Sequence, residues 1–285
     1  MKLAGTVILF DPPENVFSNI ATYINDVDIL YIFDNSVNCT NYIPKEYAEK
    51  AVYIHTGENK GIANCLNNAL KLSKEAGIEY LLTMDQDSSF NEGDMNRYMN
   101  LVGMEAHPET TSMYGIRYYP LNKNVKKLTV FNHLLITSGS IINVDAAFKI
   151  GGFDENLFID GVDTEFCLKS FEKGFQTVFY NQICLKHLLG EETKVLTPLL
   201  QNKVRKFHNP TRLYYIVRNH LYLRNKYPEL RSYLKNKIII NEIKNCILYA
   251  GNTMKYISAI LMAIRHNKNR IFGKLNHNHG LSRFA

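Results

Sequence analysis

The chain has 285 residues, of which 46% are hydrophobic and 21% charged, which excludes a largely disordered protein. Its five cysteines are widely spaced with no C-x-x-C pair, which argues against a zinc site or disulfide framework and favours free thiols in a reducing cytoplasm. The net charge of +6 is uneven, because residues 201–285 hold 17 Lys and Arg against 2 Asp and Glu. This basic tail is either a solvated helical face or a surface for a phosphate-rich partner, such as an anionic membrane, a pyrophosphate-linked substrate or nucleic acid.

Apolar runs and helical spacing alternate through the first half of the chain. Buried strands are predicted at residues 6–10, 29–33, 51–55 and 79–84, and helices at 16–24 and 61–76. This alternation predicts an α/β fold with a Rossmann-like, mostly parallel central sheet and flanking helices. Ligands of such sheets bind beyond the carboxyl ends of the strands. Residues that follow the predicted strands should therefore gather at one edge of the sheet: Asp11, Asp34, Asn59 and Asp85.

The second half is less regular. Strands are predicted at 112–116, 127–136 and 176–180, and helices at 144–150 and 163–173. From about residue 200 the chain is predicted to be helical and basic. Its apolar residues fall roughly on one helical face, which would pack on the body or lie on a membrane surface: Ile240, Ile243, Ile247, Met254, Ile257, Ile260, Leu261 and Ile264.

The segment Asp85-Gln86-Asp87 directly follows a predicted buried strand. Two carboxylates separated by one residue can approach the same Mg²⁺ or Mn²⁺, because hard cations prefer oxygen ligands and Mg²⁺ often takes only one or two carboxylates plus substrate phosphates. A nucleoside diphosphate would complete such a shell. Many ordinary turns contain the same pattern, so its place at a strand end of an α/β sheet is what favours a metal site.

Polar residues after two other strands suit a nucleoside. A carboxylate at Asp34 can accept hydrogen bonds from a ribose or a base, although a turn or capping Asp explains it as well. Asn59 and Asn64 flank Gly61, which lets the backbone approach a ligand closely. The chain contains neither G-x-G-x-x-G nor G-x-x-x-x-G-K-[ST], which argues against a dinucleotide-binding dehydrogenase and a P-loop enzyme.

A second acidic cluster contains Asp160, Asp163 and Glu165, and a small-residue turn precedes it at Ser138-Gly139-Ser140. Helix capping accounts for one or two of these carboxylates. Three within six residues favour a positioned general base that acts on a sugar hydroxyl. His187 follows a few residues beyond the last predicted strand, either as a structural histidine or as a neutral imidazole in a carboxylate–phosphate metal shell.

Together these segments resemble glycosyltransferase family 2, with the GT-A fold, and within it the bacterial rhamnosyltransferase-like group. Seven segments match in order between about residues 5 and 225, and His187 stands where the family has its late histidine. The segments are Ile32-Phe33-Asp34-Asn35-Ser36, Asn59-Lys60-Gly61-Ile62-Ala63-Asn64, Leu82-Thr83-Met84-Asp85-Gln86-Asp87-Ser88, Thr137-Ser138-Gly139-Ser140, Gly151-Gly152-Phe153-Asp154-Glu155, Phe158–Lys169, and Arg212-Leu213-Tyr214-Tyr215 with Arg218-Asn219.

The resemblance implies a role for each matching residue. It implies a catalytic base at Asp163, with Asp160 and Glu165 as competitors for that role. It implies nucleotide-sugar contacts at Asp34, Asn59, Gly61, Asn64 and Asp85. It implies a Mg²⁺ or Mn²⁺ site at Asp85, Asp87 and His187. It implies acceptor-side residues at Ser138, Gly139, Asp160, Glu165 and Arg212. Asp11, where the group often has Asn, leaves the contact after the first strand open, and Phe166 and Lys169 replace a frequent Trp and Arg.

The same resemblance divides the chain. Residues 1–200 would form the GT-A catalytic domain, with a nucleotide-sugar half at about 1–110 and an acceptor half at about 111–200. Residues 201–285 would form a basic helical region associated with a membrane or with the acceptor. The expected protein is cytoplasmic, with peripheral attachment to the inner face of the cytoplasmic membrane left open.

The expected activity is metal-dependent, inverting transfer of a sugar from a nucleotide-sugar donor. The first expectation is L-rhamnose from dTDP-L-rhamnose, added to a lipid-pyrophosphate-linked saccharide in bacterial surface-polysaccharide or O-antigen synthesis. The same mechanism with a UDP-sugar (galactofuranose, galactose or N-acetylglucosamine) is the alternative. A non-catalytic nucleotide- or polyanion-binding protein is the alternative from another class. A nucleic-acid partner is not expected, because it would leave the acidic front half without a purpose.

Overall fold

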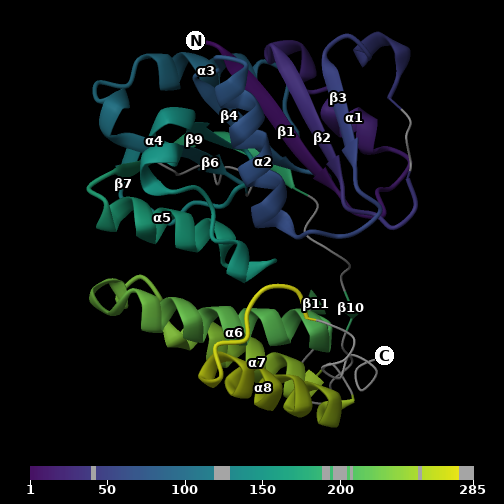
Figure 1. The fold of residues 1–285 in the computed structure, drawn as a ribbon, viewed down its shortest axis with the longest axis vertical. Helices are drawn as coiled ribbons and strands as arrows, with labels where there is room; N and C mark the ends of the chain where they lie inside the picture. The colour runs from purple at the N-terminus through teal and green to yellow at the C-terminus, as the bar shows by residue number, and fades with distance from the viewer. Residues whose placement is uncertain are drawn as a thin grey trace. The chain divides into compact units, whose positions relative to one another are not determined.

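The computed structural model describes residues 1–39, 43–118, 129–187, 193–194, 204–205, 208–249 and 252–275 (Figure 1). The chain divides into two compact units. The first contains residues 1–155 and 162–188, and the second contains residues 156–161 and 189–285. Residues 156–161 therefore belong to the second unit, although in the sequence they lie between two parts of the first.

The first unit is built on one mixed sheet, with strand order β3-β2-β1-β4-β8-β6-β9-β5 and β7 paired to β9. Its strands are β1 Leu3–Leu9, β2 Ile29–Asp34, β3 Ala51–His55, β4 Tyr80–Asp85, β5 Ser88–Phe90, β6 Thr111–Arg117, β7 Thr129–Phe131, β8 Ser140–Asn143 and β9 Gln176–His187. Strands β3, β2, β1 and β4 run parallel, and β8 pairs antiparallel with β4 and β6. The α/β prediction is confirmed, and the four early strands were each predicted to within a few residues.

Helices connect the strands and cover the sheet. Those of the first unit are α1 Val16–Ile20, α2 Ile62–Glu75, α3 Asp94–Gly103, α4 Val144–Ile150 and α5 Val162–Glu172. Short 3-10 turns lie at Ile24–Asp26, Lys45–Tyr47, Pro108–Thr110, Glu155–Leu157 and Pro228–Leu230. Helix α2 contacts β1 and β4. It buries Leu66, Ala69 and Leu70, which lie three and four positions apart on one face. This confirms the helix predicted at 61–76.

Three predicted elements differ from the structure. The helix expected at 16–24 stops at Ile20, and a separate 3-10 turn follows at Ile24–Asp26. The strand expected at 127–136 is only β7, because Asn132 adopts a left-handed backbone with φ 53°, which ends the extended run; residues 127 and 128 lie outside the described part. Strand β9 continues to His187, so this histidine ends the strand instead of following it.

The length of β9 has a structural cause. Its first half pairs with β6, where the register slips between Ile116 and Arg117, and its last residues pair antiparallel with β5. The polar residues Asn181 and Gln182 lie at this slip, between Tyr180, which pairs with Ile116, and Cys184, which pairs with Arg117. They interrupt the apolar pattern from which the shorter strand was predicted. His187 stands opposite Ser88 in the register, so it is next to the Asp85–Asp87 turn along the backbone.

The second unit consists mainly of helices α6 Pro210–Lys226, α7 Asn236–Tyr249 and α8 Thr253–Lys268, with the two-residue strands β10 Thr193–Lys194 and β11 Val204–Arg205. Helix α6 begins with a side-chain cap, since Asn209 Oδ1 accepts a hydrogen bond from the Arg212 amide at 2.8 Å and Pro210 occupies the first helical position. Its apolar residues Leu213, Tyr214 and Val217 form a core with residues of α8. Within the described residues, no helix has both the length and the apolarity that a membrane crossing demands.

Helix α6 also holds the segment 156–161. The buried Asn219 donates through Nδ2 to the carbonyls of Leu157, Ile159 and Asp160 at 2.9, 2.7 and 2.7 Å. The neighbouring Arg218 donates to the Asn156 carbonyl at 3.2 Å and to the Gly273 carbonyl at 2.8 Å. These bonds hold a backbone that is left-handed at Phe158, Asp160 and Gly161, a conformation that is costly for the two residues with side chains.

The three bonds of Asn219 lead to a stability prediction. Asn219→Ala would leave three carbonyls without this donor, so the free energy of unfolding in urea should fall by about 2 to 3 kcal/mol. Asn225→Ala, on the same helix but exposed, should change it by less than about 0.5 kcal/mol. Equal losses in the two variants would mean that the bonds to segment 156–161 contribute no net stability.

Candidate functional site

The carboxyl ends of three neighbouring parallel strands meet at one level. In the register, Leu9 of β1 stands opposite Asp34 of β2, and Ile8 of β1 stands opposite Asp85 of β4. Asp34 also stands opposite His55, the last residue of β3. Asp34 and Asp85 therefore lie at the same edge of the sheet, two strands apart, where α/β proteins bind their ligands.

Asp34 is held in place by its own surroundings. It is buried, with 2% of its surface exposed, and its Oδ1 accepts a hydrogen bond from the Ser36 amide at 2.8 Å. Its Oδ2 accepts a hydrogen bond from the Tyr53 hydroxyl on β3. Ser36 in turn accepts from the Asp11 amide at 2.8 Å, so the loops after β1 and β2 are tied together.

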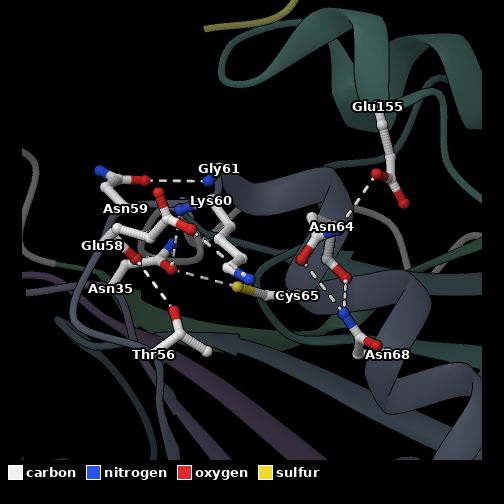
Figure 2. A network of polar contacts seen from close by, with 10 residues as sticks. All are labelled: Asn35, Thr56, Glu58, Asn59, Lys60, Gly61, Asn64, Cys65, Asn68 and Glu155. Carbon is white, nitrogen blue, oxygen red and sulfur yellow. Dashed lines mark hydrogen bonds and ion pairs between the residues drawn. The ribbon is translucent and has the colours of Figure 1, made fainter.

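A cavity of about 540 Å³ opens beside Asp34. This volume is within the range of small-molecule sites. Side chains of β2, β3, α2 and the loops next to them line it, among them Asp34, Asn35, Thr56, Lys60, Asn64 and Cys65. Figure 2 shows the polar contacts at this place: Asn35 Oδ1 accepts from the Lys60 amide at 3.3 Å and from Cys65 Sγ at 3.4 Å. Burial raises the pKa of the Cys65 thiol to about 11, so this side chain is neutral at physiological pH.

The segment that enters α2 shapes one wall of this region. Asn59 Oδ1 accepts from the Gly61 amide at 2.9 Å, and Gly61 has a φ of 85°, which favours glycine at the helix start. Asn64 donates to Glu155 Oε2 at 3.1 Å (Figure 2). Asn67, one turn further, donates to Glu155 Oε1 at 2.9 Å. Asn64 thus lines the cavity and at the same time joins α2 to the Gly151–Glu155 segment.

Gln86, between the two aspartates, braces the turn after β4 through its side chain. Its side chain accepts from the Phe10 amide at 2.8 Å and donates to the Phe10 carbonyl at 3.2 Å. Its own carbonyl accepts from Asn19 Nδ2 at 2.9 Å. Gln86 therefore fixes the turn after β4 to the loop after β1, and Asp85 and Asp87 flank the fixed residue.

Ser138 braces the same turn from another strand. Its hydroxyl accepts from the Asp85 amide at 3.2 Å and donates to Ser88 Oγ at 2.8 Å, and only 2% of its surface is exposed. Gly139 adopts φ 74°, and a Cβ there would lie 3.0 Å from a Leu185 methyl. The turn 137–140 is thus packed against the turn that contains Asp85 and Asp87, a contact between segments about 50 residues apart that no local pattern predicts.

Asp85 and Asp87 fit a divalent cation in their donor chemistry. They offer two carboxylates at a strand end. Mg²⁺ is often bound by only one or two protein carboxylates, with substrate phosphates completing its coordination shell. Burial, with a smaller effect from the negative charge of Asp85, raises the pKa of Tyr23 above its usual range. The part of the chain that the structure describes contains no preformed group of three His, Cys, Asp or Glu residues around a cation. The side chain of His187, the third predicted metal ligand, lies outside the described part of the chain.

Asp163 and Glu165 lie in the first turn of α5, yet their surroundings differ. Asp163 is half-buried, and its Oδ1 accepts from the Thr164 amide at 2.7 Å. Glu165 is fully buried, and its Oε2 lies 3.2 Å from Lys169 Nζ. Burial, with the charges of both carboxylates, raises the pKa of the Cys167 thiol to about 12. Of the two carboxylates, Asp163 is the one that solvent reaches.

Asp160 and Arg212 meet within the second unit. Asp160 Oδ1 accepts from Arg212 Nε and Nη2 at 3.3 and 3.1 Å, while Oδ2 is buried without a hydrogen-bond partner. The structure thus joins these two predicted acceptor-side residues, joins Asp34 and Asn64 at one cavity, and sets Asp85 and Asp87 in one braced turn. No individual role was predicted for the bracing residues Gln86, Tyr53, Glu155 and Asn219, since the type of a polar residue gives no sign of its partner.

Known proteins resemble this chain in sequence over most of its length. Residues 13–153 match the family model described as Glycosyl transferase family 2. The dTDP-rhamnosyl transferase RfbF of Shigella flexneri is 27% identical over 295 aligned positions, which cover 93% of this chain and 96% of that protein. Both matches confirm the family resemblance drawn from the motifs.

Solved structures show the same fold at low identity. S. aureus TarS residues 1–349 superpose with a TM-score of 0.58 at 14% identity, covering 95% of this chain and 83% of that one. The same fragment in complex with UDP-GlcNAc gives a TM-score of 0.55 at 13% identity, covering 95% and 84%. The chain spans 50% of the longer TarS structure. These likenesses confirm the predicted GT-A architecture.

The bracing by Gln86 gives a kinetic prediction. Gln86→Ala removes both hydrogen bonds to Phe10, so the loop after β1 should loosen while Asp85 and Asp87 keep their carboxylates. We expect the KM for a nucleotide-sugar donor to rise by about tenfold with a smaller change in kcat, because lost positioning weakens binding first. Gln176→Ala, which removes a partly buried bond to Thr111 Oγ1 at another end of the sheet, is the matched control and should leave both constants nearly unchanged. An unaltered KM in Gln86→Ala would show that the brace does not shape the donor site.

Proposed function

We propose that this chain, whose residues 13–153 match the model of glycosyl transferase family 2, is a member of that family and transfers L-rhamnose from dTDP-L-rhamnose to a saccharide acceptor. The observation that supports this donor most directly is the similarity to a dTDP-rhamnosyl transferase across almost the whole of both chains. A UDP-sugar is the second candidate, favoured by the fold shared with a TarS fragment that binds UDP-GlcNAc. The product would belong to a bacterial surface polysaccharide or O-antigen.

The cavity beside Asp34 would receive the nucleoside. Its lining combines a fixed carboxylate at Asp34, the amide groups of Asn35 and Asn64, and the cationic Lys60. A carboxylate whose geometry is set by two protein donors is a rigid acceptor for ribose or base hydroxyl and amine groups. Asn59 and Gly61 would border the same ligand through the backbone that enters α2.

The diphosphate would lie at the turn after β4. Asp85 and Asp87 would hold Mg²⁺ or Mn²⁺ there, with His187 as a further ligand. The cation would supply positive charge to the departing diphosphate. Gln86 and Ser138 would keep the two carboxylates oriented while the donor binds and leaves, since both brace the turn through hydrogen bonds to its backbone or its neighbours.

Asp163 would act as the catalytic base. It would take the proton from the acceptor hydroxyl as that oxygen attacks the anomeric carbon, while the bond from this carbon to the diphosphate oxygen breaks. Attack from the face opposite the leaving group inverts the configuration, so no covalent intermediate with the protein is required. The burial of Glu165 and the ion pair of Asp160 with Arg212 favour Asp163 over its two competitors.

The acceptor-side residues would be Ser138, Gly139 and Glu165 of the first unit and Asp160 and Arg212 of the second, with Ser138 and Gly139 bordering the acceptor. The acceptor would be a saccharide carried on a lipid pyrophosphate at the inner face of the cytoplasmic membrane. The excess of Lys and Arg in residues 201–285 supports an acceptor that carries phosphate.

The donor and the metal can be tested in one assay. Purified protein with Mn²⁺ or Mg²⁺ should release nucleoside diphosphate slowly from dTDP-L-rhamnose, and EDTA or Asp87→Ala should lower this release at least tenfold. Glu92→Ala, an exposed acid a few residues on, is the control and should release at the wild-type rate. Release from a UDP-sugar alone would keep the mechanism and overturn the rhamnose donor. Metal-dependent nucleotide binding in calorimetry, without release from any donor even when saccharide acceptors are added, would favour a binding protein.

The base has a separate test. Asp163→Asn should bind donor normally but transfer sugar at least about 10²-fold more slowly, because the amide cannot take a proton. Asp145→Asn is the matched control, since Asp145 occupies the first turn of α4 as Asp163 occupies that of α5, and it should transfer normally. Near-normal transfer by Asp163→Asn would move the role to Asp160 or Glu165.

A further inference from the structure

Helix α8 has two apolar faces. Its inner face consists of Tyr256, Ala259, Ala263 and His266, all buried, and it packs against α6. A second line follows the opposite side at three- and four-residue spacing: Met254, Ile257, Leu261 and Ile264. Met254, Leu261 and Ile264 are 74%, 62% and 47% exposed, and Ile257 is half-buried. We call these four residues the outer stripe of α8.

Helix α7 adds to this exposed apolar surface. Ile238, Ile240 and Leu248 are also exposed, although α7 buries Cys246 and packs Ile243 and Ile247 into the core of the unit. Of the thirteen large hydrophobic residues that are exposed in the described part of the chain, six are on these two helices. A face that only meets water would carry polar residues at such positions, so this concentration indicates a surface that is covered by something else.

The charges around the stripe have one sign. The described residues of α7, α8 and the segment after α8 carry Lys237, Lys244, Lys255, Arg265, Lys268, Arg270 and Lys274. Glu242 is their one acidic residue, and its carboxylate is directed to His208 and Cys246, at 4.0 and 3.6 Å. Arg265 and Lys268 are exposed, and each lies four residues, about one turn, after a residue of the stripe: Arg265 after Leu261 and Lys268 after Ile264.

We propose that the outer stripe of α8 rests on the surface of an anionic lipid bilayer, with its apolar side chains among the headgroups and the neighbouring Lys and Arg against lipid phosphates. An apolar stripe bordered by cations is the composition of helices that lie in a membrane interface. A second copy of the chain is a poorer occupant, because two such faces would bring like charges together with hardly any carboxylate between them. Anionic lipid supplies the missing negative charge.

The biological purpose of this bilayer contact rests on the proposed function. An enzyme whose acceptor is a lipid-linked saccharide must work at the bilayer surface, and a helix in the interface would keep it there. The observations that carry the inference, however, are independent of the donor site, since they lie entirely within the second unit.

The test is cosedimentation of the full chain with vesicles. Vesicles of phosphatidylcholine with 30% phosphatidylglycerol should bind the protein, pure phosphatidylcholine should bind it at least about tenfold less, and added salt should weaken the binding. The triple variant Met254→Ser/Leu261→Ser/Ile264→Ser should lower the partition coefficient at least about tenfold. Val37→Ser/Met104→Ser is the matched control, because it removes exposed apolar side chains from the first unit, and it should bind as wild type does.

A second variant tests the inference even if the triple variant misfolds. Arg265→Gln/Lys268→Gln keeps the apolar stripe and should bind severalfold less to anionic vesicles. Donor release without vesicles should be the same in all these variants, so its loss would count against the proposed function or the fold and not against the bilayer contact. Three results would overturn the inference: no binding of wild type to anionic vesicles, full binding by both α8 variants, or a wild-type dimer in light scattering that the triple variant converts to monomer.

Discussion

The common level at which β1, β2 and β4 end is the constraint on which the rest of the first unit depends. Parallel pairing sets Leu9 beside Asp34 and Ile8 beside Asp85, so the loops that follow must share one narrow edge. Their backbone groups then need partners, and side chains provide them: Gln86 for Phe10, Ser36 for Asp11 and Ser138 for Asp85. Each brace lies at or within two residues of Asp34 or Asp85, so the hydrogen bonds that satisfy the loops would also preorganise the proposed site.

Most of the fold could be predicted from local pattern. The alternation of apolar strands with the helix α2 was sufficient for the α/β class, and the polar residues after the strands were sufficient to locate Asp34 and Asp85 at one edge. Strands β5 and β8 were missed, because three or four residues give no periodicity to detect. The end of β9 was placed too early, since its polar bulge resembles a turn.

The site was less predictable than the fold, for a different reason. Residue type identified the carboxylates, yet it could not separate Asp163 from Glu165, which are two positions apart in one helical turn. Their difference comes from Lys169, one turn further, which pairs with Glu165 in the interior. In α8, likewise, the large apolar residues were expected to share one face, but the buried face uses Ala259 and Ala263, which allow close approach to α6. Which residue a side chain pairs with, and which face of a helix is buried, depend on distant parts of the chain. The sequence of one segment therefore does not determine them.

Segment 156–161 belongs to the second unit, and this constrains how the protein can vary in evolution. The segment lies in sequence between two parts of the first unit, but its backbone is held by Arg218 and Asn219 of the second. Recombination that exchanged only the C-terminal helices would bring in a foreign α6 opposite an unchanged segment and lose these contacts. The helices and the few residues before α5 should therefore be inherited together, as one discontinuous module.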